Sequence, residues 1–225
     1  MKTIEHFIDQ QAAAEQEFME SFHREHRSFE NPLVTVNPYG IAPLTAVIAF
    51  FTEEKVSVSI TVKGMEASGD IAKAFPEAYE HVIPVLGLYP GTDNTVELRL
   101  SDGRRKEIII TTGPLDSAVK LPESIDTTAA YMDGNVMFVI PAMGALPAAY
   151  DYRGDCRWYC TENITFAIKE LQNGRFSIGS PRLLEKPYYT TGLWEMDLIG
   201  KIYAEYRLPG GYHHDQFEMG DGDLL

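Results

Sequence analysis

Cysteine is scarce in this sequence: there are 2 in 225 residues, Cys156 and Cys160. Both lie in the segment DCRWYC, whose aromatic content favours a β-strand. In an extended strand their Cα atoms would be about 13 Å apart at roughly 3.3 Å per residue, whereas a disulfide needs less than about 7 Å. We therefore expect two free, packed thiols. A metal site is the less favoured interpretation, because no second pair completes a zinc set.

Long hydrophobic runs are also missing. No apolar stretch approaches the roughly 18 residues of a membrane helix, and residues 1–18 lack the apolar core of about 7 to 15 residues found in a secretory signal. Hydrophobic residues make up 44% and charged residues 23%, as in ordinary soluble proteins. The sequence as written predicts a cytoplasmic protein without a membrane partner; if a signal sequence was removed, the location would be periplasmic or exported.

Positive charge is in short supply. The sequence contains 19 Lys and Arg residues and 33 Asp and Glu residues, which gives a formal net charge of -14. Such a balance argues against a polyanionic partner, so we expect neither nucleic acid nor an anionic membrane surface to bind. Any anionic substrate would need a locally positive pocket.

The chain begins with a pattern that is typical of an amphipathic helix, within residues 1–29. Apolar side chains recur there at steps of mostly three or four residues among Glu, Gln and Ala. They are Ile4, Phe7, Ile8, Ala12, Phe18, Met19 and Phe22. His23 and His26 lie three residues apart and could share a metal, but no third ligand is near them in the sequence. We interpret this pair as part of a solvated helical face.

Residues 30–115 consist of short runs in which apolar and polar residues alternate between Gly, Pro, Asn and Asp. The runs are PLVTVNP, LTAVIAFFT, VSVSITVKG, HVIPVLGLYP, NTVELRLSDG and RRKEIIITTGPL. About six strands with turn signals between them predict a small β-sandwich. The segment GMEASGDIAKAF is ambiguous, either a loop or a single helical turn. Residues 116–128 lose the alternation and read as a linker.

Residues 129–225 contain internal repeats. The phrases MDGNVMFVI, LQNGRFSIG and MGDGDLL place glycines at Gly134, Gly174 and Gly222, which are 40 and 48 residues apart. The phrases YDYRGDCRWYC and MDLIGKIYAEY place Asp151 and Asp197 46 residues apart. This period is typical of β-propeller blades. We expect one full blade and the start of a second, that is, a truncated propeller in a mainly all-β chain.

Several long phrases resemble one enzyme family. NPYGIAPLTAVIAFF, HVIPVLGLYPGTDNTVELRL, YDYRGDCRWY and EMDLIGKIYAEYRLPGGYHHDQFEMGDGDLL are similar to the bacterial arylsulfate sulfotransferases that do not use a nucleotide sulfate donor. The resemblance runs from about Glu30 to Leu225. It implies a homodimer in which an N-terminal β-sandwich precedes a six-bladed propeller. It also implies transfer of a sulfuryl group from an aryl sulfate to a phenol through a sulfohistidine, with no cofactor.

The resemblance points to His213 and His214, in GYHHD, as candidate catalytic residues. It implies that one of them contacts the sulfuryl group or the phenol, while the nucleophilic histidine and a sulfuryl-binding arginine belong to later blades. Because neighbours on a strand point to opposite faces, only one can face the propeller tunnel, and the register favours His214. Asp215 could orient the other ring or cap the turn. Without the resemblance, a His-His-Asp run is most often a solvated turn. It is a poor metal site, because alternate faces of a strand separate the two histidines.

Two interpretations of the function stay open. In the first, the chain is the N-terminal part of an arylsulfate sulfotransferase and is inactive by itself. In the second, it is a β-sandwich module for binding or dimerisation, with a propeller stub and no catalysis. Six aromatic residues could line an aryl-binding wall, although blade cores use the same residue types and this second role is favoured. They are Tyr150, Tyr152, Trp158, Trp194, Tyr203 and Tyr206.

Overall fold

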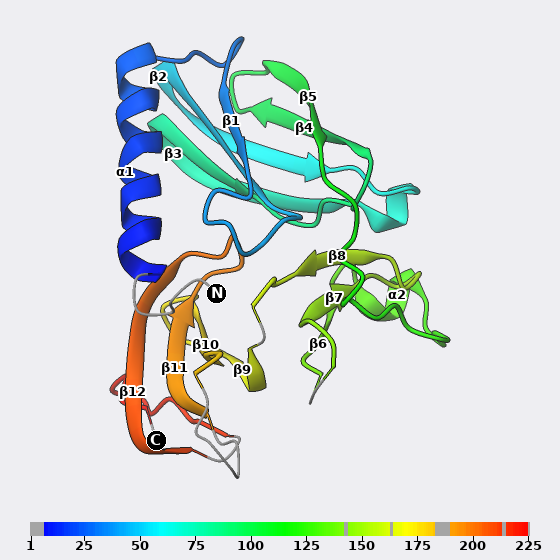
Figure 1. The fold of residues 1–225 in the computed structure, drawn as a ribbon. Coiled ribbons are helices and arrows are strands. Elements are labelled where there is room, and N and C mark those ends of the chain that lie inside the picture. The colour runs from blue at the N-terminus through cyan, green and yellow to red at the C-terminus, as the bar shows by residue number, and fades with distance from the viewer. Residues whose placement is uncertain (1–6, 142–143, 163, 183–189, 213–214, 225) are drawn as a thin grey trace.

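The computed structural model describes residues 7–141, 144–162, 164–182, 190–212 and 215–224 (Figure 1). The predicted N-terminal helix is confirmed as α1, Phe7–Glu25. Its buried side chains, Phe7, Gln11 and Phe22, lie on one side, as the spacing of the apolar residues requires. Phe22 stacks on Phe51 of the neighbouring sheet with ring centroids 4.4 Å apart, so the helix packs along this sheet.

Five strands form the first sheet, in the order β1-β2-β4-β5 with β3 also paired to β2. They are β1 Leu33–Val36, β2 Ala46–Val62, β3 Ile71–Val85, β4 Asp93–Leu100 and β5 Arg105–Thr111. β2 pairs with β1 at its start and with β4 at its end, while β3 follows it through both halves. The strands of the expected sandwich are therefore hydrogen-bonded into one curled sheet.

Two boundaries within this sheet differ from the sequence prediction. LTAVIAFFT and VSVSITVKG form one strand, because the polar segment around Thr52 continues as a bulge, with shifts of register between Phe51 and Val58, instead of turning back. β3 starts already at Ile71, inside the stretch that was ambiguous in the sequence. Of the two alternatives left open, a loop or a single helical turn, a 3₁₀ turn, Ala67–Gly69, is present just before it.

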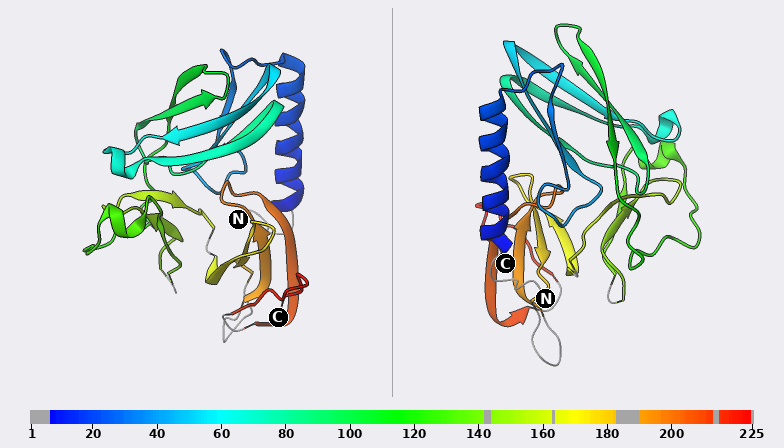
Figure 2. Two further views of the ribbon diagram at one scale, coloured as in Figure 1. Left: turned by 180° about the vertical axis from the view of Figure 1, so that it is seen from behind. Right: turned by 45° about the horizontal axis from the view of Figure 1, so that its top comes forward.

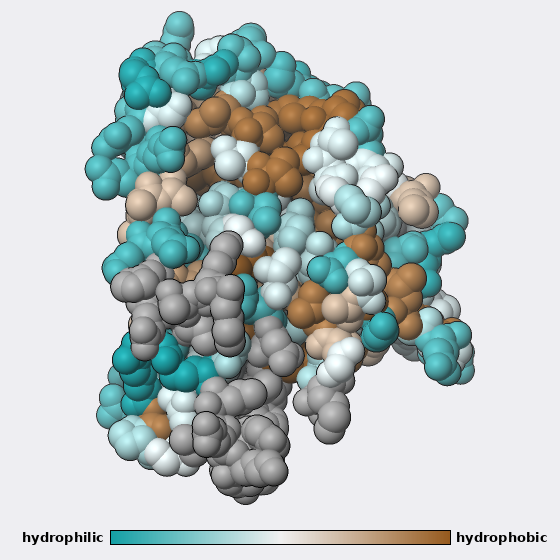
Figure 3. All heavy atoms as spheres, in the orientation of Figure 1, coloured by the Kyte–Doolittle hydropathy of each residue, from teal (hydrophilic) through white to brown (hydrophobic). Residues whose placement is uncertain are grey.

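The core of the first sheet lies on its inner, curled face. Alternate residues of β4 and β5 are buried there, including Val96, Leu98 and Ile110. Ile109, which precedes Ile110 in β5, is 58% exposed. In the space-filling view, hydrophobic residues gather over this sheet and hydrophilic residues cover the outer side of α1 (Figure 3).

Residues 129–224 form a short helix and two smaller antiparallel sheets below the first one (Figures 1 and 2). The helix is α2, Ala129–Met132. The three-stranded sheet contains β6 Met137–Val139, β7 Ala148–Tyr150 and β8 Cys156–Tyr159. The four-stranded sheet contains β9 Thr165–Glu170, β10 Phe176–Gly179, β11 Thr190–Met196 and β12 Ile202–Tyr212.

The division into sheets differs from the expected one full blade and a second opening strand. The boundary falls between β8 and β9, so the complete four-stranded meander is the second of the two sheets. A repeat length fixes the period of the pattern but not the strand at which each sheet begins, which explains the difference. Closure of these sheets into a propeller stays a prediction.

The repeats read from the sequence share one backbone turn. In four hairpins within the described part of residues 129–224, the first residue donates its N–H to the carbonyl of the fifth residue, and the fourth residue, a glycine, donates to the first; the hairpin between β4 and β5 has the same bonds. The glycines are Gly154, Gly174, Gly200 and Gly222, with φ of 85°, 77°, 91° and 90°. Gly134 is different: it follows α2 and has no part in such a turn. The repeat therefore rests on spacings of 46 and 48 residues.

We predict that Gly200→Ala destabilises the protein more than Gly174→Ala does. Both glycines have positive φ, which costs alanine about 1 to 2 kcal/mol. A Cβ on Gly200 would also lie 2.9 Å from Cγ1 of buried Ile41, whereas Gly174 faces open space. We expect about 1 kcal/mol for Gly174→Ala and about 2 to 4 kcal/mol for Gly200→Ala from urea unfolding curves. Equal losses would contradict this packing argument.

We also predict that both cysteines resist alkylation in the folded protein. The expected free thiols are confirmed, and both are buried. Burial raises the pKa of Cys156 to about 11 and that of Cys160 to about 12, so the reactive thiolate is scarce at pH 8. Mass spectrometry after iodoacetamide treatment should find no adduct on the native chain and two adducts on the urea-unfolded chain. Rapid labelling of the native chain would show that the thiols are accessible.

Candidate functional site

The candidate residues His213 and His214 lie outside the described residues. The strand before them is β12, and its last residue, Tyr212, pairs with Thr190 of β11. The histidines therefore follow directly on the outermost strand of the four-stranded sheet in the order β12-β11-β10-β9.

The chain beyond the two histidines returns to the same sheet. Gln216 is buried, and its side-chain Nε2 donates to the carbonyl of Ser177 on β10 at 3.2 Å. The exposed carboxylate of Asp215 lies 3.1 Å from the ammonium of Lys169 on β9. The described residues on either side of the histidines, Tyr212 and Asp215 to Gln216, thus contact the four-stranded sheet.

A fully buried arginine, Arg157 on β8, connects the three-stranded sheet to the first sheet. Its Nε donates to the carbonyl of Gly87 at 2.8 Å, and Nη1 donates to the carbonyl of Gly69 at 3.0 Å and to the hydroxyl of Tyr89 at 2.9 Å. The guanidinium also stacks over the Tyr89 ring, 4.0 Å from its centroid. Nη1 completes an ion pair with Oδ2 of Asp151 at 3.1 Å. We name these five residues the Arg157 cluster.

Asp151 joins this cluster to the turn between β7 and β8. Its Oδ1 accepts the backbone N–H groups of Arg153 at 2.9 Å and Asp155 at 3.2 Å, while Oδ2 accepts from Arg157 and Tyr89. Both carboxylate oxygens are therefore used. Because the pair is almost completely buried, removal of one partner would leave an uncompensated charge in the interior.

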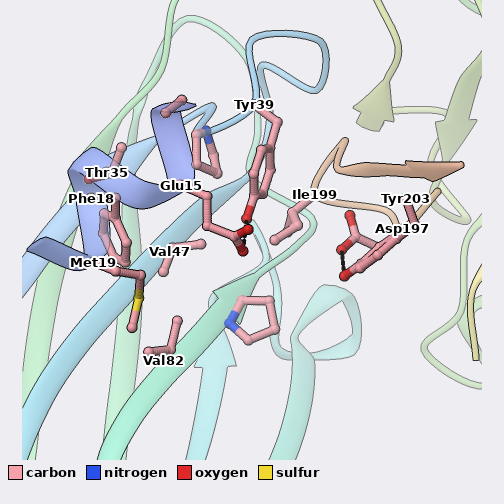
Figure 4. Close-up of a pocket in the computed structure, with 13 residues that line it drawn as sticks. Glu15, Phe18, Met19, Thr35, Tyr39, Val47, Val82, Asp197, Ile199 and Tyr203 are labelled. Carbon is pink, nitrogen blue, oxygen red and sulfur yellow. Dashed lines mark hydrogen bonds between the residues drawn. The ribbon is translucent and has the colours of Figure 1, made fainter. Parts of the chain in front are cut away.

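A cavity of about 290 Å³ lies between α1, the first sheet and the turn that leads into β12; we name it the α1 cavity (Figure 4). Most of its wall is apolar, formed by Ala14, Phe18, Met19, Pro38, Val47, Val82, Pro84 and Ile199. Its polar groups come from Glu15, Thr35, Tyr39, Asp197 and Tyr203.

Hydrogen bonds orient the polar groups of the α1 cavity (Figure 4). The hydroxyl of Tyr39 donates to Glu15 at 3.1 Å, and that of Tyr203 donates to Asp197 at 3.0 Å. The ammonium of Lys201 lies 2.6 Å from both carboxylate oxygens of Glu15. Burial raises the pKa of Tyr203 to about 12 and the pKa of Asp197 above its ordinary value. Burial raises the pKa of Tyr39 as well. At neutral pH both tyrosines therefore keep their protons and donate to the carboxylates.

Gln11 attaches α1 to the turn beside the cavity. Its side-chain Nε2 donates to the carbonyls of Gly200 at 2.8 Å and Tyr39 at 3.1 Å, and its Oε1 accepts the N–H of Ile202 at 2.8 Å. This side chain is buried, although it lies on a helix that is otherwise rich in exposed polar residues. The helix is therefore bonded to both the first and the four-stranded sheet.

His23, near the end of α1, and His26, which follows the helix, take part in local contacts. Nε2 of exposed His23 lies 3.1 Å from a carboxylate oxygen of Glu80, and His26 stacks on Phe51 at 4.4 Å. Within the described ranges, no group of three His, Cys, Asp or Glu side chains is placed to hold a metal. No helix in the described part of the chain is long and apolar enough to cross a membrane.

Two family models match the chain one after the other. Residues 33–116 match the model described as the arylsulfotransferase Ig-like domain, and residues 122–225 match the model described as arylsulfotransferase (ASST). The chain belongs to the arylsulfotransferase family. The family suggested by the sequence phrases is thereby confirmed.

Two curated proteins are similar to this arylsulfotransferase chain. They are the arylsulfate sulfotransferases AssT of Escherichia coli O6:H1 (strain CFT073) and of Lelliottia amnigena, and each is 23% identical to it. Both alignments cover 85% of this chain and 42% of the relative. The chain thus spans less than half the length of the curated relatives it matches.

Sequence reasoning missed the Arg157 cluster and the α1 cavity. The repeated phrase did mark Asp151 and Asp197, and each is the first residue of a repeated turn. It gave no sign of their partners, Arg157 and Tyr203, since a charged or hydroxyl-bearing residue in a strand is most often exposed. Of the six aromatic residues considered for an aryl-binding wall, both tryptophans are buried in the core where the two smaller sheets meet.

We predict that Asp151→Asn strongly destabilises this arylsulfotransferase chain. The change removes one charge of a buried pair, which typically costs about 3 to 5 kcal/mol, and should lower the denaturation midpoint accordingly. Glu66→Gln is the matched control, because it removes the partner of an exposed ion pair with Arg153. We expect no measurable change from the control. A small effect of Asp151→Asn would contradict the role of the Arg157 cluster in joining the sheets.

Proposed function

We propose that the chain is the N-terminal part of an arylsulfate sulfotransferase, a transferase that moves a sulfuryl group from an aryl sulfate to a phenol. The observation that supports this most strongly is the succession of two arylsulfotransferase family models over residues 33–116 and 122–225. In this proposal the chain supplies the Ig-like domain and the first sheets of a six-bladed propeller, the complete enzyme is a homodimer, and the 225-residue chain is inactive by itself.

The chemistry of a sulfate monoester sets the requirements for such a site. The ester carries negative charge, so a neutral imidazole is a suitable nucleophile and N–H donors must stabilise the sulfuryl oxygens. In the first step a histidine nitrogen bonds to sulfur while the bond to the aryl oxygen breaks, and the departing phenolate takes up a proton. In the second step the acceptor phenol loses its proton, its oxygen bonds to sulfur, and the nitrogen–sulfur bond breaks.

We assign the contact with the sulfuryl group or the phenol to one of His213 and His214, with His214 favoured. The nucleophilic histidine belongs to a later part of the complete enzyme. The attachment of the flanking residues supports the assignment: Tyr212 ends β12, and Gln216 returns to β10. Catalytic contacts require defined positions, and both described neighbours of the two histidines are held by the four-stranded sheet.

The test is a sulfuryl-transfer assay with 4-nitrophenyl sulfate as donor and phenol as acceptor, on the complete reading frame and on the 225-residue chain. We expect release of nitrophenolate by the former and none by the latter. His214→Ala should lower kcat by about 10² to 10³, as loss of one donor to developing charge does. His23→Ala, on the exposed side of α1, is the matched control and should leave the rate unchanged. Absence of transfer by the complete protein would refute the proposal and favour a binding propeller.

A further inference from the structure

We propose that the α1 cavity is a second binding site, which takes a neutral phenol and rejects its sulfate ester. The choice of phenol as ligand class rests on the proposed function. The site itself rests on the size, the walls and the charges of the cavity.

The walls of the α1 cavity suit a single aromatic ring. Phe18 and Met19 of α1 stand on one side, and Val47 of β2 and Val82 of β3 on another (Figure 4). A volume of about 290 Å³ has room for one substituted ring, since a cavity of about 150 Å³ is enough to bind benzene. Apolar walls with a few polar groups at one place are the usual composition of a small-molecule site, and a methionine adapts to the outline of an aromatic ring.

The charges at the polar end select against an anion. Two carboxylates, Glu15 and Asp197, line the cavity, and one ammonium, Lys201, binds Glu15. The guanidinium of Arg175 stacks on Tyr203, 3.6 Å from the ring centroid, but it is paired with Glu195 at 2.8 Å. The remaining charge is negative. An aryl sulfate would be repelled, whereas a neutral phenol would not.

The carboxylates can still accept a hydrogen bond from a ligand. An ionised carboxylate has roughly four acceptor positions. The backbone N–H of Lys201 donates to Oδ1 of Asp197, and the hydroxyl of Tyr203 donates to Oδ2, both at 3.0 Å. The backbone N–H of Ile199 also donates to this carboxylate, which leaves roughly one acceptor position. A phenolic O–H is a donor of the same kind as the Tyr203 hydroxyl, so a ligand with its oxygen at this end would repeat an interaction that the cavity already contains.

This site is separate from the predicted catalytic histidines. The cavity lies at the turn that starts β12 at Ile202, and the histidines follow its end at Tyr212. At about 3.3 Å per residue, these two ends of the strand are up to about 33 Å apart. A phenol in the cavity touches α1, the first sheet and the turn before β12 at once. Its binding should therefore raise the melting temperature, because the ligand binds only the assembled arrangement.

The experiment is titration calorimetry of the 225-residue chain with three ligands that share one ring. 4-Methylphenol is neutral at pH 7, as the tyrosine side chain is. 4-Methylphenyl sulfate carries a negative charge, and 4-methylanisole is neutral but lacks the O–H donor. We expect saturable binding of 4-methylphenol, about tenfold weaker binding of the ether, and weaker binding still of the sulfate. Absence of saturable phenol binding, or equal binding of phenol and sulfate, would overturn the proposal.

Substitutions locate the ligand. Met19→Trp fills the cavity and should weaken phenol binding about tenfold or more, whereas Tyr131→Trp, at a residue of α2 that is 86% exposed, should not change it. If circular dichroism shows that Met19→Trp is unfolded, Ala14→Trp at the exposed rim repeats the test. Unchanged binding by a folded variant of either kind would refute the location.

Failure of this proposal can be told apart from failure of the proposed function. Ligand binding is measured on a chain without turnover, so the absence of sulfuryl transfer by the complete protein leaves the cavity result standing. Conversely, an active complete protein whose 225-residue part binds no phenol refutes the second site alone.

Discussion

The buried ion pair between Arg157 and Asp151 is the interaction on which the arrangement of this chain depends. The backbone carbonyls that Arg157 binds, at Gly69 and Gly87, come from the segments just before and just after β3 of the first sheet, while Asp151 organises the turn between β7 and β8. A guanidinium is suited to this position because its donors are fixed in a plane and its charge is never lost. The pair holds Arg157 in place, and the hydrogen bonds of Arg157 to Gly69, Gly87 and Tyr89 connect the three-stranded sheet to the Ig-like domain.

The α1 cavity occupies a second junction, which is built in a different way. Here the first sheet meets the four-stranded sheet through the helix, and the contacts are hydrogen bonds and partly exposed ion pairs around Glu15 and Lys201. Solvent screens such pairs more than it screens the Arg157 pair. The two junctions thus differ: a buried arginine connects the segments at the first one, whereas a larger cavity lies at the second one.

Local patterns predicted much of this fold, and tertiary contacts account for the remainder. The spacing of Phe7, Phe18 and Phe22 is sufficient to predict α1, because a helix must bury one face. The polar residues around Thr52 suggested a turn, but pairing with β3 on one side keeps β2 extended through them. Arg157 could not be recognised, since its carbonyl partners lie about 70 and 88 residues away. The histidine pair stays a prediction from family resemblance.

The anchoring of α1 through Gln11 has a consequence for the order in which the chain folds. The ribosome adds Gln11 to the chain early, but its partners Gly200 and Ile202 follow 189 and 191 residues later. At about 5 to 20 residues per second, a ribosome needs roughly 10 to 40 s to synthesise the intervening chain. During that interval the first sheet can form, and Gln11 can bind its earlier partner, the carbonyl of Tyr39, which lies 28 residues away. The attachment of α1 to the turn before β12 is therefore a late event of biosynthesis.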